Sequence, residues 1–164
     1  MSNTALKEQA LRLGKQAKIA ARLLAPLSSA EKNRALLLMA AKLEAKSGFL
    51  VEENKKDLEL AKANGVSSAV LDRIALDPSR VQAMAQGLHD VAALPDPVRE
   101  VVKMWRRPNG LQVGRMRIPL GVICIIYEAR PNVTADAAAL CLKSGNAVIL
   151  RGGGEAHHSN EAIG

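Results

Sequence analysis

The sequence predicts an α/β fold in which a helical layer precedes a β-hairpin and the start of a βαβ unit. Three observations carry this prediction. Apolar residues recur at helical spacing through about residue 94, and two prolines, Pro95 and Pro97, then end the helical pattern. Residues 95–119 contain two strand-like runs around a turn. Residues 120–164 contain two apolar runs separated by a helical stretch, which is typical of strands in a parallel sheet.

The first two helices are predicted from spacing and capping residues. Apolar side chains recur at one-face spacing from Leu6 to Leu24, and Pro26 ends this first helix. Ser28 and Glu31 form the pattern of a capping box, in which each side chain satisfies a backbone amide at a helix start. We therefore expect a second helix from about this point to Ser47.

Three more helices complete the expected helical layer. Gly48 is expected to break the second helix from a third, which runs to Ala63 and stops at the following Asn-Gly pair. A short helix is expected over about 68–74. Asp77-Pro78 places a capping carboxylate before a proline at the first helical position, which predicts a fifth helix to about Val91.

The prolines near residue 95 introduce the β part of the chain. Residues 98–106 and 111–118 are rich in Val, Met and Ile, and they flank the turn pair Asn109-Gly110. This pattern predicts a β-hairpin, with a bulge expected at Gly114 because glycine inside a strand often marks one.

Two apolar runs in the last segment predict a βαβ unit. Val122 to Tyr127 shows no alternation, which predicts a strand buried on both faces, and residues 147–150 predict a second such strand. Apolar groups at helical spacing over 133–143 predict the connecting helix. Ligands bind outside the carboxyl ends of strands in open parallel sheets, so the residues after Tyr127 and after Leu150 are the candidate site.

Composition excludes several functional classes. The chain is 48% hydrophobic and 24% charged, as in ordinary globular domains, and no apolar stretch is long enough for a membrane span. The net charge of +7 suits phosphate-bearing ligands, but basic and acidic residues alternate, so we do not expect nucleic-acid binding. Cys124 and Cys141 lie in apolar runs, which predicts buried, unreactive thiols and a reducing cytoplasmic location.

The residues of the candidate site have alternative interpretations. Asn132 could act as a helix N-cap or could bind a ligand, and Gly152, Gly153 and Gly154 could form a turn or allow a ligand to approach the backbone. The dinucleotide fingerprint fails, because His157 stands where its third glycine belongs. Glu155, His157 and His158 are not expected to bind a metal, because adjacent histidines at a helix start point to different faces and no third ligand is supplied.

A long run of residues resembles one enzyme family. The matching residues lie in three segments of the β part, Arg117–Val122, Ile126–Thr134 and Leu142–Gly153, and in two segments of the helical part, Glu31–Arg34 and Leu71–Ile74. These segments resemble the gamma-glutamyl phosphate reductases of the aldehyde dehydrogenase superfamily. The resemblance implies the amino-terminal part of a Rossmann-like aldehyde dehydrogenase cofactor domain, left incomplete here. It also implies reduction of L-glutamate 5-phosphate by NADPH in proline synthesis, with release of phosphate.

The same resemblance implies roles for individual residues. Asn132 corresponds to an amide that stabilises the oxyanion on the acyl carbon, and Arg151, Gly152, Gly153 and Glu155 correspond to a cofactor-binding loop. The family's nucleophilic cysteine belongs to a later segment, so this chain is expected to lack the catalytic cysteine domain and to be inactive alone. The alternative is a catalytically dead basic fragment that acts as a binding or subunit-interaction module. The sequence leaves the oligomeric state open, including a homo-oligomer.

Overall fold

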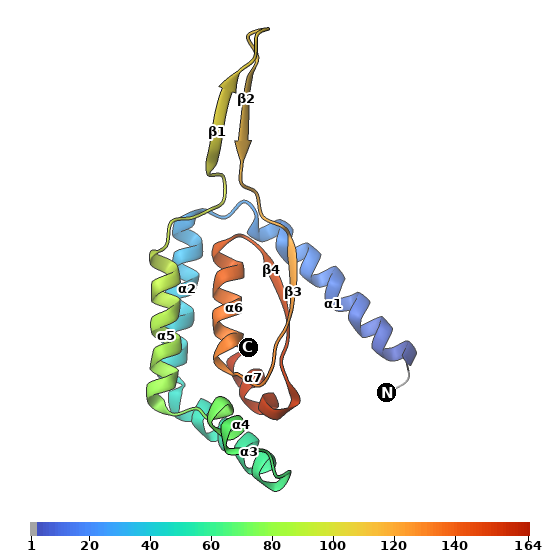
Figure 1. The fold of residues 1–164 in the computed structure, drawn as a ribbon, viewed down its shortest axis with the longest axis vertical. Coiled ribbons are helices and arrows are strands. Elements are labelled where there is room, and N and C mark those ends of the chain that lie inside the picture. The colour runs from blue at the N-terminus through green and yellow to red at the C-terminus, as the bar shows by residue number, and fades with distance from the viewer. Residues whose placement is uncertain (1–2) are drawn as a thin grey trace.

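The structure is a computed structural model, and it describes residues 3–164. Helices precede a hairpin and a parallel strand pair, as the sequence predicts (Figure 1). The helices are α1 (Asn3–Leu24), α2 (Ser29–Ala45), α3 (Ser47–Ala63), α4 (Ser68–Ile74), α5 (Pro78–Ala93), α6 (Asn132–Lys143) and α7 (His157–Ile163), with a 3₁₀ turn, η1 (Gly154–Ala156). The strands are β1 (Val101–Arg106), β2 (Gln112–Met116), β3 (Val122–Ile126) and β4 (Ala147–Arg151).

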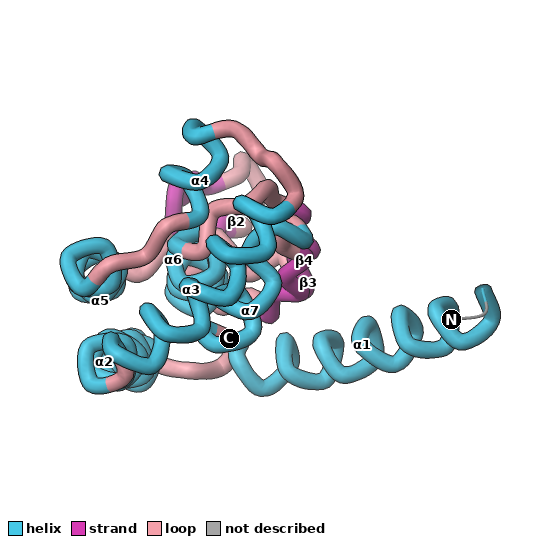
Figure 2. The backbone as a smooth tube through the Cα atoms, turned by 90° about the horizontal axis from the view of Figure 1, so that it is seen from below, coloured by secondary structure: helices cyan, strands magenta, loops and turns pink. Residues whose placement is uncertain are grey.

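The elements of the body lie in layers. Helices α2 and α5 pack side by side, α6 packs against both of them, and the β3–β4 pair lies between α6 and α1 (Figure 1). Helix α1 runs along the far side of this strand pair and extends away from the other helices (Figure 2). None of the helices described over residues 3–164 is both long and apolar enough to cross a bilayer.

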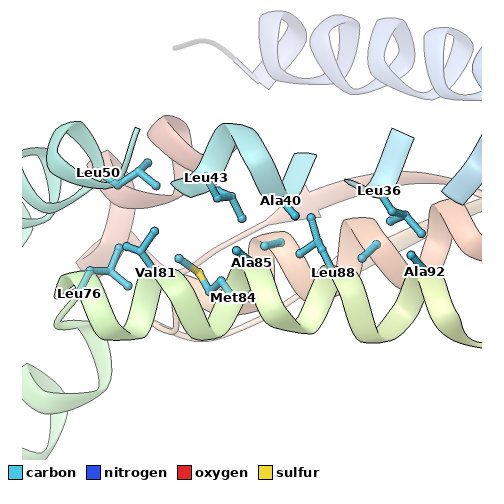
Figure 3. Packing of buried hydrophobic residues seen from close by; sticks show 12 residues of the cluster. Leu36, Ala40, Leu43, Leu50, Leu76, Val81, Met84, Ala85, Leu88 and Ala92 are labelled. Atoms are coloured by element: carbon cyan, nitrogen blue, oxygen red, sulfur yellow. The ribbon is translucent and has the colours of Figure 1, made fainter. Parts of the chain in front are cut away.

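The hydrophobic core lies mainly between α2, α5 and α6. Its buried side chains are almost entirely aliphatic, so dispersion contacts and removal of apolar surface from water stabilise the layer. Each fully buried leucine or valine contributes about 1.5–3 kcal/mol relative to an exposed one. The core residues shown in Figure 3 include Leu36, Ala40, Leu43, Leu50, Leu76, Val81, Met84, Ala85, Leu88 and Ala92.

The predicted helix caps are confirmed, but the predicted break at Gly48 is wrong. The Ser28 side chain accepts from the Glu31 amide at 3.3 Å, and the Ser28 amide donates to the Glu31 carboxylate at 2.8 Å. The Asp77 carboxylate likewise accepts from the Arg80 amide at 2.8 Å. The break falls instead at Lys46, whose φ and ψ of −102° and 12° separate α2 from α3, and Gly48 lies inside α3. Any residue can adopt the negative φ of Lys46, so this boundary does not require a glycine and Gly48 does not mark it.

The predicted hairpin is confirmed, and it projects from the body (Figure 1). Gly110 has a φ of 87°, which suits the glycine of the predicted turn. The bulge prediction is wrong, because Gly114 pairs regularly with Met104 and the register shift lies between Val101 and Lys103. A Cβ atom at Gly114 would overlap the Met104 side chain, so this glycine makes room for a cross-strand neighbour.

The parallel β3–β4 pair is confirmed, but the prediction that β3 is buried on both faces is wrong. Every second side chain of β3 is exposed: Ile126 is 79% exposed, and Val122 and Cys124 are also exposed. In the part of the chain that the structure describes, the parallel sheet has two strands, so β3 has a neighbour on one edge alone. Its apolar run therefore does not produce burial, because burial depends on covering layers.

A buried polar cluster joins the helical layer to the base of the hairpin. Lys32 is buried, and its Nζ atom lies 2.5 Å from Asp96 Oδ2 and donates to the Lys143 carbonyl at 3.1 Å. Asp96 also accepts from the Ser29 hydroxyl at 2.7 Å and from the Val98 amide at 2.9 Å. Burial alone would raise the pKa of Asp96, but the hydrogen bonds from Lys32, Ser29 and Val98 outweigh it and lower that pKa.

Candidate functional site

The two candidate loops leave the same edge of the parallel strand pair. Ile126 pairs with Arg151 in the register, and the Tyr127 amide donates to the Arg151 carbonyl at 3.1 Å. Because β3 and β4 run in parallel, the residues that follow them meet at the carboxyl edge of the sheet (Figure 1). The structure therefore places both loops at one edge of the sheet, while their role as a ligand site stays a prediction.

A hydrogen-bond chain fixes the first loop against α6 and α7. The Tyr127 hydroxyl lies 2.6 Å from the Thr134 hydroxyl, which in turn donates to Asn160 Oδ1 at 3.1 Å. Thr134 is buried in the first turn of α6, and Asn160 lies in α7. This chain holds the end of β3 and the helix after β4 in a fixed relation, which is the requirement for a preorganised ligand site.

Two glycines let the second loop pass close to its neighbours. A Cβ atom at Gly152 would lie 3.0 Å from Asn160 Cγ and 3.1 Å from the Tyr127 hydroxyl. A Cβ atom at Gly153 would lie 3.1 Å from the Ala129 amide nitrogen. Gly154, by contrast, has open space where a Cβ would be. Close packing thus explains Gly152 and Gly153, so these two glycines do more than allow a flexible turn.

The charged residues of this loop remain accessible. Arg151 ends β4 and is exposed, and its guanidinium donates to the neighbouring Gly152 carbonyl. Glu155 lies in η1 and is also exposed. Among the described residues neither side chain forms an ion pair, so the guanidinium can bind a phosphate and the carboxylate can accept hydrogen bonds from hydroxyls.

Asn132 begins α6 and is not its cap. Pro131 occupies the N-cap position with a φ of −55° and makes no side-chain capping bond. The Asn132 amide instead donates to Asp136 Oδ2 at 3.1 Å, one helical turn further on. The N-cap interpretation of Asn132 is therefore wrong for this structure. An amide nitrogen carries two hydrogens, so one donor remains available at the exposed mouth of the site.

A pocket of about 300 Å³ opens beside Asn132. It lies between the end of α4, the start of α5 and the first turns of α6, and it combines charged groups with an apolar wall. Its volume is at the lower end of the range for small-molecule sites, roughly 300–1,000 Å³. The lining residues are Arg73, Ala75, Leu76, Arg80, Ala83, Met84, Asn132 and Asp136.

Neither cysteine lies at this edge of the sheet. Cys141 is buried in α6, as predicted, and desolvation raises the pKa of its thiol. Cys124 is in the middle of β3 and is exposed, so the prediction that it is buried is wrong. Within residues 3–164, no three His, Cys, Asp or Glu side chains come together as candidate metal ligands.

Sequence reasoning missed the buried polar residues that anchor α7. The Asp57 carboxylate accepts from the amides of His158 and Ser159 at 3.0 and 2.8 Å and from the Ser159 hydroxyl at 2.6 Å. The Asn54 side chain donates to the same Ser159 hydroxyl at 2.9 Å. The only signal in the sequence is position: Asn54 and Asp57 fall on the buried face of α3, between Leu50 and Ala61.

Comparison with known proteins gives this site a family context. No protein-family model matches the chain. Over 158 residues the chain is 60% identical to the gamma-glutamyl phosphate reductase of Geobacter metallireducens. The matched segment covers 96% of this chain and 38% of that protein. The enzyme of the same name from Syntrophomonas wolfei is 59% identical over 158 residues, with the same coverage. The chain is a relative of gamma-glutamyl phosphate reductase.

Solved structures agree with this relationship. The gamma-glutamyl phosphate reductase of Thermotoga maritima superposes with a TM-score of 0.91 at 42% identity, over 93% of this chain and 37% of that chain. The Saccharomyces cerevisiae enzyme gives 0.86 at 34% identity, over 93% and 39%. A salicylaldehyde dehydrogenase from Pseudomonas putida, at 20% identity and a TM-score of 0.68 over 95% and 30%, shares the fold. The predicted family resemblance and fold class are confirmed, and the chain spans about 38% of the length of its curated relatives.

Proposed function

We propose that this chain supplies part of an NADPH-dependent gamma-glutamyl phosphate reductase. The reaction reduces L-glutamate 5-phosphate to L-glutamate 5-semialdehyde and releases phosphate, a step of proline synthesis. The observation that carries the proposal is 60% identity over 96% of the chain to a protein of that name. Asn132 and the Arg151 loop lie at the same sheet edge, which supports the proposal, because a substrate at Asn132 and a cofactor at the loop could then bind side by side.

The residues present fit a nicotinamide cofactor. Arg151 has no carboxylate partner among the described residues, so its guanidinium can pair with a 2′-phosphate. Gly152 and Gly153 already pack closely against Asn160 and Ala129, which holds the loop backbone in place beside that guanidinium. Glu155 can accept hydrogen bonds from ribose hydroxyls. When bound, the cofactor supplies a hydride to the acyl carbon.

Asn132 is proposed to stabilise charge on the substrate. Attack of a thiolate on the acyl carbon places negative charge on the acyl oxygen, and phosphate then leaves to give a thioester. The free N–H of the Asn132 amide can donate to this oxygen, while its hydrogen bond to Asp136 fixes the orientation of the amide. The thiolate is not Cys124, which lies in the middle of β3, nor Cys141, which is buried.

The proposal can be tested with a chimera. The chain would replace the 158 matched residues of the Geobacter metallireducens reductase. The reverse reaction would be measured as the reduction of NADP to NADPH in the presence of L-glutamate 5-semialdehyde and phosphate. We expect turnover by the chimera and a decrease in kcat of about 10²–10³-fold on Asn132→Ala. The control is Asn64→Ala, which removes an exposed asparagine at the end of α3 and should leave kcat unchanged.

The cofactor part of the proposal has its own measurement. Arg151→Met in the chimera should raise KM for NADP more than KM for NAD, because only the former carries the 2′-phosphate that the guanidinium would bind. The 164-residue chain alone is expected to show no turnover, because neither of its thiols is placed to attack. A folded chimera without activity would contradict the proposal and favour a binding or subunit-interaction role for the chain.

A further inference from the structure

The pocket beside Asn132 contains side chains of opposite charge from different helices. Arg73 comes from α4 and Asp136 from α6, and both line the pocket together with the Asn132 amide. A pocket in which a guanidinium, a carboxylate and an apolar wall meet is complementary to a small molecule that carries both charges. Arg80 also lines this pocket, but its guanidinium is already hydrogen-bonded to protein groups.

Arg80 is held by protein partners, whereas Arg73 has donors to spare. The Arg80 guanidinium donates to the Ala75 carbonyl at 2.9 Å and to the Asp72 carboxylate at 2.6 Å, which closes the turn between α4 and α5. Arg73 has one ionic neighbour among the described residues, Glu128, at 4.0 Å. The Glu128 side chain is 90% exposed, so this contact is weak. Arg73 is therefore the guanidinium available to bind a carboxylate in two-point fashion.

Asp136 is a carboxylate without a cation partner among the described residues. Its Oδ2 atom accepts from the Asn132 amide at 3.1 Å. Its Oδ1 atom faces α5 at Gly87, where a Cβ would lie 3.6 Å away. Asp136 is half-buried, and a carboxylate has about four acceptor positions, so its remaining lone pairs can accept from an ammonium group.

The geometry points to Arg73 and Asp136 as the pair that recognises the amino-acid end of the substrate. Arg73 binds the α-carboxylate, Asp136 binds the α-ammonium group, and the apolar wall at Ala83 and Met84 contacts the two methylenes that lead to the acyl carbon at Asn132. This assignment rests on the proposed function, which provides a substrate with these three parts. It makes Arg73 and Asp136 specificity-determining residues for an α-amino acid.

The test uses the 164-residue chain and three probes that differ by one charged group. L-Glutamine has the complete amino-acid head and an uncharged γ-carbonyl, 4-aminobutanamide lacks the α-carboxylate, and glutaramate lacks the α-ammonium group. Affinities would be measured by ligand-observed NMR. We expect L-glutamine to bind about tenfold more tightly than either analogue, since each charge-assisted hydrogen bond contributes about 1.5 kcal/mol or more.

Each variant should abolish one of these preferences. Arg73→Met should weaken L-glutamine and glutaramate binding about tenfold and leave 4-aminobutanamide unchanged, and Arg73→Lys should restore part of the loss. Asp136→Asn should weaken only the two probes with an ammonium group. Arg115→Met, which removes an exposed arginine from β2, is the charge-matched control and should change no affinity.

Several outcomes would overturn the inference. Equal weakening of all three probes by Arg73→Met would indicate a structural role, and equal affinity of the unaltered chain for all three would show that the head is not recognised. These outcomes are separable from failure of the proposed function. An active chimera with unchanged probe selectivity in Arg73→Met refutes the recognition pair alone, whereas an inactive chimera refutes the reaction.

Discussion

Replacement of Asp57 by alanine should destabilise the chain through the start of α7. Asp57 is 2% exposed, and its carboxylate accepts three hydrogen bonds from His158 and Ser159 at 2.6–3.0 Å. Alanine leaves the partly buried His158 amide and the buried amide and hydroxyl of Ser159 without this acceptor. At about 1 kcal/mol for each donor left unpaired, the free energy of unfolding should fall by about 3 kcal/mol.

Urea unfolding followed by far-ultraviolet circular dichroism measures this change, because most of the chain is helical. With a slope of about 2 kcal/mol per molar urea, the midpoint should decrease by about 1.5 M. Glu59→Ala is the control, since it removes an exposed carboxylate from the same helix and should shift the midpoint little. A loss below about 1 kcal/mol for Asp57→Ala would refute the argument that α7 depends on this carboxylate.

Three further predictions concern Gly152, the two cysteines and Asp96. Gly152→Ala should lower the free energy of unfolding by about 1–3 kcal/mol because its Cβ would crowd the chain of hydrogen bonds around it, whereas Gly154→Ala should be nearly neutral. Iodoacetamide should label the exposed Cys124 in the folded chain, and Cys141 only after unfolding, as read by peptide mass spectrometry. Stability should fall as pH decreases below about 4, because the pKa of Asp96 is lowered in the folded state and the unfolded chain takes up the proton first.

Each of these predictions has a contradicting result. Equal destabilisation by the two glycine substitutions would show that space at Gly152 is not limiting. Labelling of Cys141 in the native chain at the rate of Cys124 would contradict its burial. Asp96→Asn should remove part of the acid-induced loss of stability, and an unchanged pH profile in this variant would assign that loss to other carboxyl groups.

Features set by neighbours in the sequence were predictable. The capping box of Ser28 and Glu31 needs two residues three positions apart, and the turn at Gly110 needs a residue that tolerates a positive φ. The candidate site was predictable to the level of two loops, because parallel strands bring their carboxyl ends to one edge. These arguments require no knowledge of distant contacts.

Features set by distant partners were not predictable. Asp57 and Asn54 read as ordinary polar residues of a helix, and their partner Ser159 lies about one hundred positions away in the sequence. The half-exposure of β3 likewise depends on which layers cover it and not on its apolar residues. The prediction of a bulge at Gly114 was wrong for a related reason. The residue opposite in the partner strand decides whether a strand glycine forms a bulge or leaves space for a cross-strand side chain, here that of Met104.

The sequence by itself determined the helical layer, the hairpin and the parallel strand pair, because periodicity, capping and turn residues act over a few positions. It also carried the family resemblance, through long runs of matching residues. Only the tertiary structure decided that Asn132 bonds to Asp136 instead of capping α6, and that Arg73 lines the same pocket. Arg73 and Asp136 lie on α4 and α6, which are separated in the sequence by α5, the hairpin and β3, so their proximity is a consequence of packing. The physical reason is that pockets form between elements, where side-chain volume and charge from distant segments meet.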